Sequence, residues 1–242
     1  MKIAVVTGAS TGIGRAVAVA LASQGYFIYL LARNEERLAE TKKLITGDGG
    51  QAEIITTDLS SIDSINKSIK TIKEKTDRID LLVNVAGIWH GSDEVFANKD
   101  LESFDQKTIM DTFFVGTIAP TLLSHAFIPY MVYGAKIINI SGTFENGAKG
   151  WLPYYVSKRA IEDLTVALSQ ELEEKGIQVN GISPSDTATD TYAKFFPEYM
   201  SDAIAPYEIA KAILLLADPS NSVSGKIFVI KKGQEISEGF HS

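Results

Sequence analysis

Short apolar runs that alternate with longer amphipathic segments constrain the fold of this chain more than any other feature. Most of the runs are continuously apolar, which is typical of strands covered on both faces. The succession of strand and helix predicts a parallel sheet with helices on both faces and right-handed crossovers. We find no repeat, low-complexity tract or linker, so the sequence predicts one α/β domain over residues 1–242. The predicted strands are 2–7, 27–32, 51–57, 79–85, 135–141, 177–183 and 226–231, and the predicted helices include 13–24, 35–46, 61–76, 155–174 and 206–217.

The composition narrows the possible functions. The 242 residues, 45% of them hydrophobic, are enough to bury a large core. The absence of cysteine excludes disulfides, a cysteine nucleophile and thiolate metal sites. His90, His125 and His241 lack metal-ligand spacing, so no metal site is predicted. A net charge of −7 without basic blocks argues against nucleic acid or an anionic membrane as a partner and favours a small molecule.

Neither a targeting segment nor a membrane span is expected. The apolar run in MKIAVVTG is too short for a signal peptide and leads into glycine-rich sequence. Residues 113–132 have the length of a span, but Pro120, His125 and Pro129 interrupt them. A helix buried between the sheet and a subunit interface explains this stretch better. Together with the lack of cysteine, these features predict a cytoplasmic protein.

The first predicted strand runs into TGASTGIG, residues 7–14, and then into a helix. Gly8, Gly12 and Gly14 permit a tight turn and a close backbone approach, so the helix can present free N–H groups to a pyrophosphate. Any strand-to-helix turn can use glycines, but the position at the first such junction indicates a nucleotide site.

The end of the second predicted strand discriminates between dinucleotides. A carboxylate there accepts from a ribose 2′-hydroxyl, whereas a cation favours a 2′-phosphate. The stretch LLARNEERL places Arg33 at this turn and no acid, which favours NADP(H), with NAD(H) as the second possibility. Alternatively, Arg33 caps a surface turn beside Glu35 and Glu36, two acids that would weaken phosphate binding if they pointed inward.

Two further stretches follow strands on the same side. Asp58, in TTDLSS, is placed to accept from the adenine amino group or to cap the next helix. The stretch NVAG, residues 84–87, ends the fourth predicted strand, where small residues let the backbone approach the adenosine ribose.

The ordered set of motifs resembles the short-chain dehydrogenase/reductase family over almost the whole chain. The motifs are TGASTGIG, DL at 58–59, NVAG, a serine ending strand five, YYVSK and NGISPSDTAT. The resemblance implies a three-layer, doubly wound Rossmann-type fold with a mostly parallel seven-stranded sheet. It also implies nicotinamide-dependent interconversion of a carbonyl and an alcohol, and a homotetramer or homodimer built through two long central helices. The implied cofactor-binding residues are Gly8, Ser10, Thr11, Gly12, Ile13, Gly14, Arg33, Asp58, Leu59, Asn84, Ala86, Gly87, Tyr154, Lys158, Pro184, Thr187 and Thr189.

The stretch WLPYYVSKRA holds two tyrosines upstream of one lysine. Residues three or four apart share a helix face, so geometry alone permits Tyr154 or Tyr155 to pair with Lys158. The Tyr-x-x-x-Lys pattern of the family selects Tyr154. A neutral phenol suits protonation of the alkoxide that hydride transfer leaves, and the neighbouring ammonium is expected to lower its pKa from about 10. The resemblance also implies that Lys158 binds the nicotinamide ribose.

Ser141 resembles the family serine that hydrogen-bonds the substrate oxygen. Its separation from Tyr154 fits the family, but placing the strand end by pattern allows Gly142 to occupy the serine position. Thr143 is then the alternative hydroxyl.

The sequence departs from the family pattern at two other positions. Ser185 follows Pro184 where the family usually has glycine, ahead of Thr187 and Thr189, which resemble the groups that hold the carboxamide. Phe113 stands where the family commonly has an asparagine that supports a water relay to the lysine.

Three irregular segments, 88–103, 142–153 and 184–205, each follow the C-terminal end of a strand and are expected to roof the substrate site. Their aromatic residues suit an apolar or ring-bearing carbonyl compound, and the alternative is that they belong to the core or to a subunit interface. The candidates are Trp89, His90, Trp151, Tyr155, Tyr192, Phe195 and Phe196.

The sequence therefore predicts an NADP(H)-dependent oxidoreductase that interconverts a carbonyl and a secondary alcohol, with Ser141, Tyr154 and Lys158 as catalytic residues. The first alternative is a dinucleotide-binding sensor or interaction protein whose catalysis is weakened at Phe113. A purely structural scaffold is the second alternative, and the phosphate-binding turn argues against it.

Overall fold

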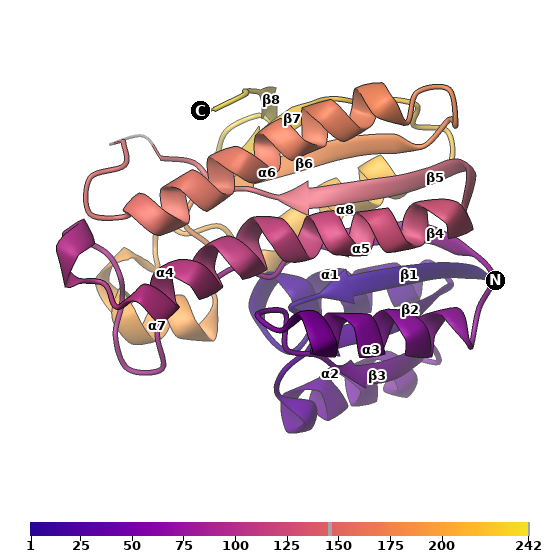
Figure 1. Cartoon of the computed structure of the whole chain (residues 1–242), viewed down its shortest axis with the longest axis horizontal. Coiled ribbons are helices and arrows are strands. Elements are labelled where there is room, and N and C mark those ends of the chain that lie inside the picture. Colours follow the sequence, from indigo (N-terminus) through magenta and orange to yellow (C-terminus); the bar gives the residue numbers. More distant parts are fainter. Residues whose placement is uncertain (145–146, 242) are drawn as a thin grey trace.

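The computed structural model describes residues 1–144 and 147–241, so residues 145 and 146 of the predicted loop 142–153 lie outside the described part. Eight strands form one sheet in the order β3-β2-β1-β4-β5-β6-β7-β8 (Figure 1). All neighbouring pairs are parallel except β7 and β8. The strands are β1 (Lys2–Thr7), β2 (Tyr26–Ala32), β3 (Gln51–Thr56), β4 (Ile79–Asn84), β5 (Met131–Ile140), β6 (Gln178–Pro184), β7 (Ile227–Ile230) and β8 (Ser237–Glu238).

The mostly parallel sheet confirms the predicted fold class, but the strand number of seven is wrong. The eighth strand, β8, has two exposed residues that pair antiparallel with β7. Because so short an exposed strand needs no apolar pattern, the sequence carries no signal for it.

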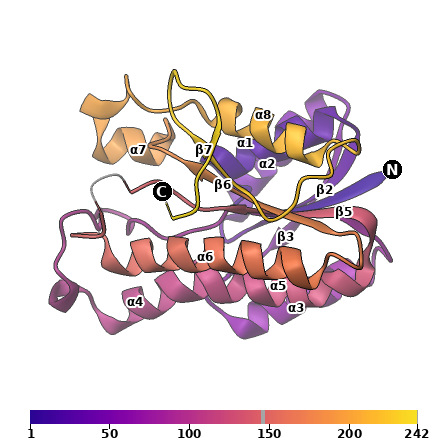
Figure 2. The same ribbon diagram turned by 90° about the horizontal axis from the view of Figure 1, so that it is seen from above.

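Helices cover both faces of the sheet, as Figure 2 shows. Helices α1, α2 and α8 pack on one face, where alternate strand residues such as Ala4 and Val6 join their core. Helices α3, α5 and α6 pack on the other face, toward which Val5 points. The α-helices are α1 (Gly12–Ser23), α2 (Glu35–Gly47), α3 (Ile62–Lys73), α4 (Gln106–Phe113), α5 (Ala119–Phe127), α6 (Leu152–Glu171), α7 (Asp190–Phe195) and α8 (Pro206–Ala217).

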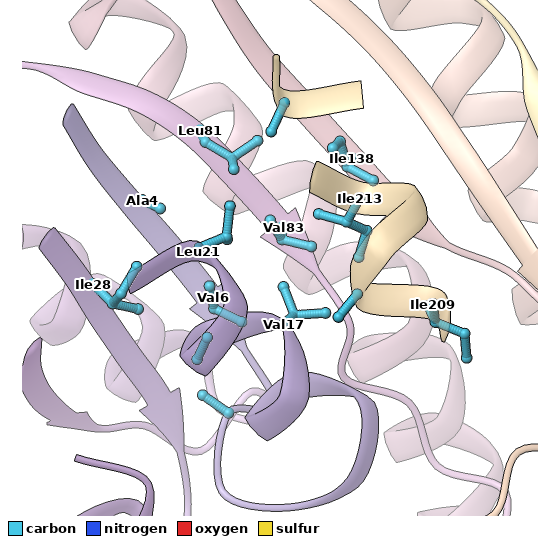
Figure 3. Close-up of a cluster of buried hydrophobic side chains, with 14 of the residues drawn as sticks. Ala4, Val6, Val17, Leu21, Ile28, Leu81, Val83, Ile138, Ile209 and Ile213 are labelled. Atoms are coloured by element: carbon cyan, nitrogen blue, oxygen red, sulfur yellow. The ribbon is translucent and has the colours of Figure 1, made fainter. Parts of the chain in front are cut away.

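The core under α1 and α8 holds the first strand–helix unit in place (Figure 3). Val17 and Leu21 of α1 are fully buried together with Ile209 and Ile213 of α8. Burial of side chains of this size contributes about 1.5–3 kcal/mol each, so α1 is firmly fixed against the sheet. Its N-terminus, next to the end of β1, is thereby fixed as well.

The strand order reverses at β1, which lies between β2 and β4. In open α/β sheets the crevice at such a reversal, beyond the carboxyl ends of the strands, is where ligands bind. The loops after β1, β2, β4, β5 and β6 all meet at this edge.

Two helical segments differ from the sequence-based expectation in ways that bear on function. Helix α6 begins at Leu152 rather than 155, so Tyr154 lies in its first turn. Helices α4 and α5 are joined by a π-helical turn, Phe114–Ile118. The continuous segment Gln106–Tyr130 is long and apolar enough to cross a membrane by length and composition alone, and 44% of its most apolar window is buried inside the protein. It packs against the sheet, α3 and α6, as the buried-helix interpretation predicts.

Candidate active site

A cavity of about 1130 Å³ opens at the carboxyl edge of the sheet. Its wall includes the glycine turn after β1, Arg33 after β2 and the Tyr154–Lys158 pair of α6. Every residue predicted to bind the cofactor lies in this wall except Asn84. Asn84 is buried below it and donates from Nδ2 to Asn139 Oδ1 at 2.8 Å, which ties β4 to β5.

The glycine turn has the geometry of a phosphate cradle. Gly8 and Gly12 adopt φ of +67° and +53°, a region that favours glycine. The first N–H groups of a helix have no intrahelical acceptor, and the N-cap residue of α1, Thr11, makes no side-chain capping bond to them, so they can bind a ligand in the cavity. Arg15 donates to the Ser10 carbonyl oxygen at 2.6 Å and stiffens the turn. These residues fit a dinucleotide pyrophosphate, because the free N–H groups and the helix dipole both favour an anion.

Substitution of Gly14 by alanine is expected to destabilise the protein by at least about 3 kcal/mol, a fall in Tm of roughly 6–12 °C. A Cβ at this position would lie 2.2 Å from the Gly8 carbonyl oxygen, a backbone atom that cannot move without opening the turn. Gly47→Ala is the matched control, since a Cβ at the end of α2 meets nothing within 4 Å. That control is expected to be neutral or up to about 1 kcal/mol more stable. Equal Tm values for the two variants in thermal unfolding would contradict the close packing of the turn.

Two exposed arginines lie at the cavity, Arg33 in the turn between β2 and α2 and Arg37 in the first turn of α2. Within the part of the chain that the structure describes, Arg33 forms no ion pair. Asn34 caps α2 by accepting from the Arg37 N–H at 2.8 Å. Glu35 and Glu36 occupy the first turn of α2 and are exposed, and neither lines the cavity.

Asp58 lines the cavity and is not the cap of α3, a role that Ser61 takes by accepting from the Ser64 N–H. Partial burial alone would raise the pKa of Asp58. Hydrogen bonds from Ser60, together with the positive charges of Arg33 and Lys107, hold the pKa of this carboxyl below its ordinary value. Asp58 is therefore a hydrogen-bond acceptor at neutral pH.

Tyr154 and Lys158 lie one helical turn apart on α6, and both side chains lie close to Gly87. The Lys158 Nζ lies 5.5 Å from the centre of the Tyr154 ring and donates to the Ile140 carbonyl oxygen at 2.8 Å. A Cβ on Gly87 would lie 3.2 Å from this Nζ and 3.8 Å from the Tyr154 ring, so glycine leaves space against the pair. Tyr155 does not line the cavity and packs its ring on Phe144 and Arg159 instead.

The pKa values of the pair follow from their burial. Burial raises the pKa of the Tyr154 phenol well above its ordinary value, and the Asp186 carboxylate adds to the rise. The expected net lowering of the phenol pKa is thus wrong for this structure, because loss of solvation dominates. Burial also lowers the pKa of Lys158 to about 8, while Glu162 acts in the opposite direction. The phenol is a neutral proton donor at pH 7, and the lysine is still mostly charged.

Replacement of Lys158 by methionine is expected to stabilise the fold by about 2 kcal/mol at pH 7. The pKa depression from 10.5 to about 8 corresponds to about 3 kcal/mol, and loss of the hydrogen bond to Ile140 offsets about 1 kcal/mol. Between pH 8 and about 10.4 the unfolded chain binds a proton at Lys158 that the folded chain lacks, so the parent gains stability as pH rises through this window. The advantage of the variant should therefore shrink from pH 8 to 10 in denaturant titrations. Lys43→Met, at an exposed position on α2, should show no such pH-dependent difference.

Ser141 follows β5 and is buried, and its hydroxyl is bound within the protein. Its Oγ contacts Glu162 Oε1 closely and lies 3.2 Å from the Lys158 carbonyl oxygen. Glu162 is fully buried, pairs with Arg159 at 3.2 Å and accepts from the His241 N–H at 2.6 Å. Ser141 lines the cavity, but its hydroxyl is engaged with α6, and among the described residues it makes no hydrogen bond to Tyr154.

Aromatic side chains form the substrate end of the cavity. Trp89 stacks on Phe196 with ring centres 6.3 Å apart and lies 6.4 Å from the Tyr192 ring. Lys194 of α7 donates to the Ser92 carbonyl oxygen and to Asp93, so it links the segment after β4 to the segment after β6. Five of the seven predicted aromatic candidates line the cavity, whereas Tyr155 and Phe195 do not. The five are Trp89, His90, Trp151, Tyr192 and Phe196.

Comparison with known proteins decides the family. Residues 2–199 match the short chain dehydrogenase family. This chain belongs to the short-chain dehydrogenases. Its relatives include carbonyl reductase family member 4 of Danio rerio, 30% identical over 97% of this chain and 98% of that protein. The 3beta-hydroxysteroid dehydrogenase of Mediterraneibacter gnavus is 34% identical over 78% of this chain and 67% of that protein. The solved structure of the landomycin C-6 ketoreductase LanV, with bound NADP and rabelomycin, has a TM-score of 0.82 at 26% identity and covers 94% of each chain.

As a short-chain dehydrogenase, the protein is an oxidoreductase of carbonyl and alcohol groups that uses a nicotinamide dinucleotide. Of its departures from the family pattern, Phe113 ends α4 next to the π-helical turn, is half-buried and does not line the cavity. Ser185 donates its N–H to the Ile230 carbonyl oxygen at 2.9 Å, which holds the start of the loop after β6 against β7. Thr189 caps α7 with its hydroxyl and still lines the cavity.

Sequence reasoning missed three polar residues of this short-chain dehydrogenase site. Glu162 follows Lys158 by four residues within α6, so its helical spacing was a usable signal. Arg33 precedes α2, so no such spacing pointed to Arg37. Asp186 lines the cavity and influences both Tyr154 and Tyr192. It had no signal beyond its place in the loop after β6.

Proposed function

We propose that this short-chain dehydrogenase is an NADP(H)-dependent reductase of ring-bearing or otherwise apolar carbonyl compounds, with Tyr154 as the general acid. One observation carries the proposal. The same cavity wall holds the glycine turn, the unpaired cation of Arg33 among the described residues, and the Tyr154–Lys158 pair.

The cofactor would lie along the carboxyl edge of the sheet. The glycine turn and the N-terminus of α1 would hold the pyrophosphate, and Arg33 the 2′-phosphate. Gly87 leaves room for the nicotinamide ribose against Lys158. When bound, NADPH supplies the hydride for the carbonyl carbon. Relatives and neighbours support this choice, since LanV was solved with NADP.

Tyr154 would hydrogen-bond the substrate oxygen and protonate it as the hydride arrives. Its raised pKa keeps the phenol protonated at neutral pH, which a proton donor requires. Lys158, whose pKa of about 8 leaves it mostly an ammonium at pH 7, would stabilise the phenolate that forms. The Lys158 side chain is held against β5 by its hydrogen bond to the Ile140 carbonyl oxygen.

The substrate class follows from the aromatic end of the cavity. Trp89, Tyr192 and Phe196 offer ring faces and edges to a flat apolar compound. The names of two relatives support a ring-bearing ketone, since one acts on a hydroxysteroid and the other was solved with rabelomycin. Assembly as a homodimer or homotetramer and a cytoplasmic location stay predictions.

Stopped-flow measurement of NADPH oxidation with a panel of aryl, fused-ring and linear aliphatic ketones tests the proposal. We expect turnover with NADPH and a preference for ring-bearing ketones. A protein that binds NADPH tightly but oxidises it with no carbonyl in the panel would instead be the dinucleotide-binding sensor or interaction protein. Preference for short aliphatic ketones would overturn the substrate class alone.

A further inference from the structure

We propose that the Thr143 hydroxyl, rather than that of Ser141, is the second hydrogen-bond donor to the substrate oxygen beside Tyr154. The inference rests on the proposed carbonyl reduction and deepens it. It assigns Ser141 to positioning α6 and leaves the donor role to the next hydroxyl along the chain.

The only proton of the Ser141 hydroxyl is already used inside the protein. Both of its contacts, Glu162 Oε1 and the carbonyl oxygen of Lys158, are acceptors. A hydroxyl has one proton to donate, so Ser141 has none left for a carbonyl oxygen. Glu162 Oε2 also accepts from Arg159 Nη1 at 3.2 Å and from the His241 N–H at 2.6 Å, so the Glu162 carboxyl acts as an acceptor in these contacts.

Ser141 lines the cavity, but redirecting its single proton to a ligand would leave the buried Glu162 carboxylate short of a donor. Glu162 has no exposed surface, and Ser141 itself is 3% exposed. Water therefore cannot replace the lost hydrogen bond without opening the contact between β5 and α6. The Ser141–Glu162 contact instead fixes the helical turn that carries Lys158.

The position that faces the Tyr154 hydroxyl from the end of β5 is Gly142. A Cβ on this residue would lie 3.9 Å from the Tyr154 hydroxyl oxygen and 3.8 Å from the Phe144 ring. These are ordinary contact distances, so the position has room for a side chain and carries none. The space beside the phenol is consequently open to a donor from the next residue or to a bulkier substrate group.

Thr143 follows this position directly in the sequence and lines the cavity. Its two neighbours both approach Tyr154, Gly142 as described and Phe144 with ring centres 5.8 Å apart. Its own N–H donates to the Pro184 carbonyl oxygen at 3.2 Å, which fixes its backbone between β5 and β6. Thr143 is half-buried in the cavity wall, and within residues 1–144 and 147–241 its hydroxyl has no hydrogen-bond partner. Its proton is therefore available to a ligand.

Steady-state reduction of 1-tetralone, a fused-ring aryl ketone, by the NADPH-loaded enzyme tests the inference with four variants. Thr143→Val, which removes the hydroxyl at constant shape, should lower kcat/KM at least tenfold, whereas Thr143→Ser should stay within about twofold of the parent. Ser141→Ala should lower kcat/KM less than Thr143→Val does but should lower Tm. Adding Gly142→Ser to Thr143→Val should recover most of the loss, because it places a hydroxyl at the open position.

A binding measurement separates this inference from the proposed function. Trp89 and Trp151 line the cavity, so their fluorescence reports 1-tetralone binding to the NADP⁺-loaded protein without turnover. A parent that binds but never reduces ketones would refute the proposed function, and Thr143→Val should still weaken ketone binding. Unchanged binding and kcat/KM in Thr143→Val, with a tenfold or larger loss in Ser141→Ala, would overturn the assignment of Thr143. NADPH affinity should stay within twofold of the parent in every variant.

Discussion

Tyr154→Phe is expected to lower kcat for ketone reduction by at least about 1000-fold while leaving NADPH affinity within about threefold of the parent. The phenylalanine keeps the ring beside Phe144 and Lys158 but removes the proton that the product alkoxide needs. General acid catalysis contributes roughly 10²–10⁴-fold, and the phenylalanine ring has no proton to donate. Single-turnover NADPH oxidation and a separate NADPH titration measure the two quantities.

The adjacent phenol provides a matched control. Tyr155→Phe removes the same hydroxyl one residue further along α6, from a side chain outside the cavity wall. It should retain kcat within about twofold. If Tyr155→Phe abolished turnover and Tyr154→Phe did not, the pairing of Tyr154 with Lys158 would be wrong.

The sequence predicted the strands and helices that surround the site, because the elements of a parallel sheet produce short-range periodic patterns of apolar residues. Continuous apolar runs placed β1, β4 and β6 within a residue of their observed ends, and the glycine turn followed from its position after β1. The early start of α6 also had a signal. Pro153 is favoured in the first turn of a helix and could have moved the predicted start from 155 back to Leu152.

The parts that escaped prediction depend on contacts between distant segments. The Ser141 hydroxyl turns toward Glu162, whose other oxygen is held by a backbone N–H near the C-terminus, 79 residues away. No window of sequence around Ser141 contains that information. The phenol pKa escaped for the same reason, because burial and Asp186 of another loop outweigh the neighbouring lysine.

The predicted cofactor preference depends partly on local sequence and partly on contacts that only the structure shows. The Arg33 position follows from the end of β2, but its freedom from Glu35 and Glu36 required the structure. Both acids lie in the first turn of α2 and outside the cavity wall, so neither neutralises the Arg33 guanidinium at the cavity. The exposed acids still contribute a repulsion that salt screens over about 10 Å at 0.1 M.

Arg33→Ala is expected to weaken NADPH binding by about 100-fold and NADH binding by less than about threefold. A charge-assisted hydrogen bond contributes about 1.5–3 kcal/mol, which corresponds to roughly 10- to 160-fold in affinity, and only NADPH carries the 2′-phosphate that receives it. Lys43→Ala removes the same charge from an exposed position on α2 outside the cavity wall, so it controls for the change in net charge. Fluorescence titrations of both cofactors at two salt concentrations should show the NADPH advantage of the parent shrinking with salt and nearly lost in Arg33→Ala. A parent protein that bound NADPH and NADH equally would refute the cofactor preference, because the cation at the end of β2 would then make no contact that distinguishes a phosphate from a hydroxyl.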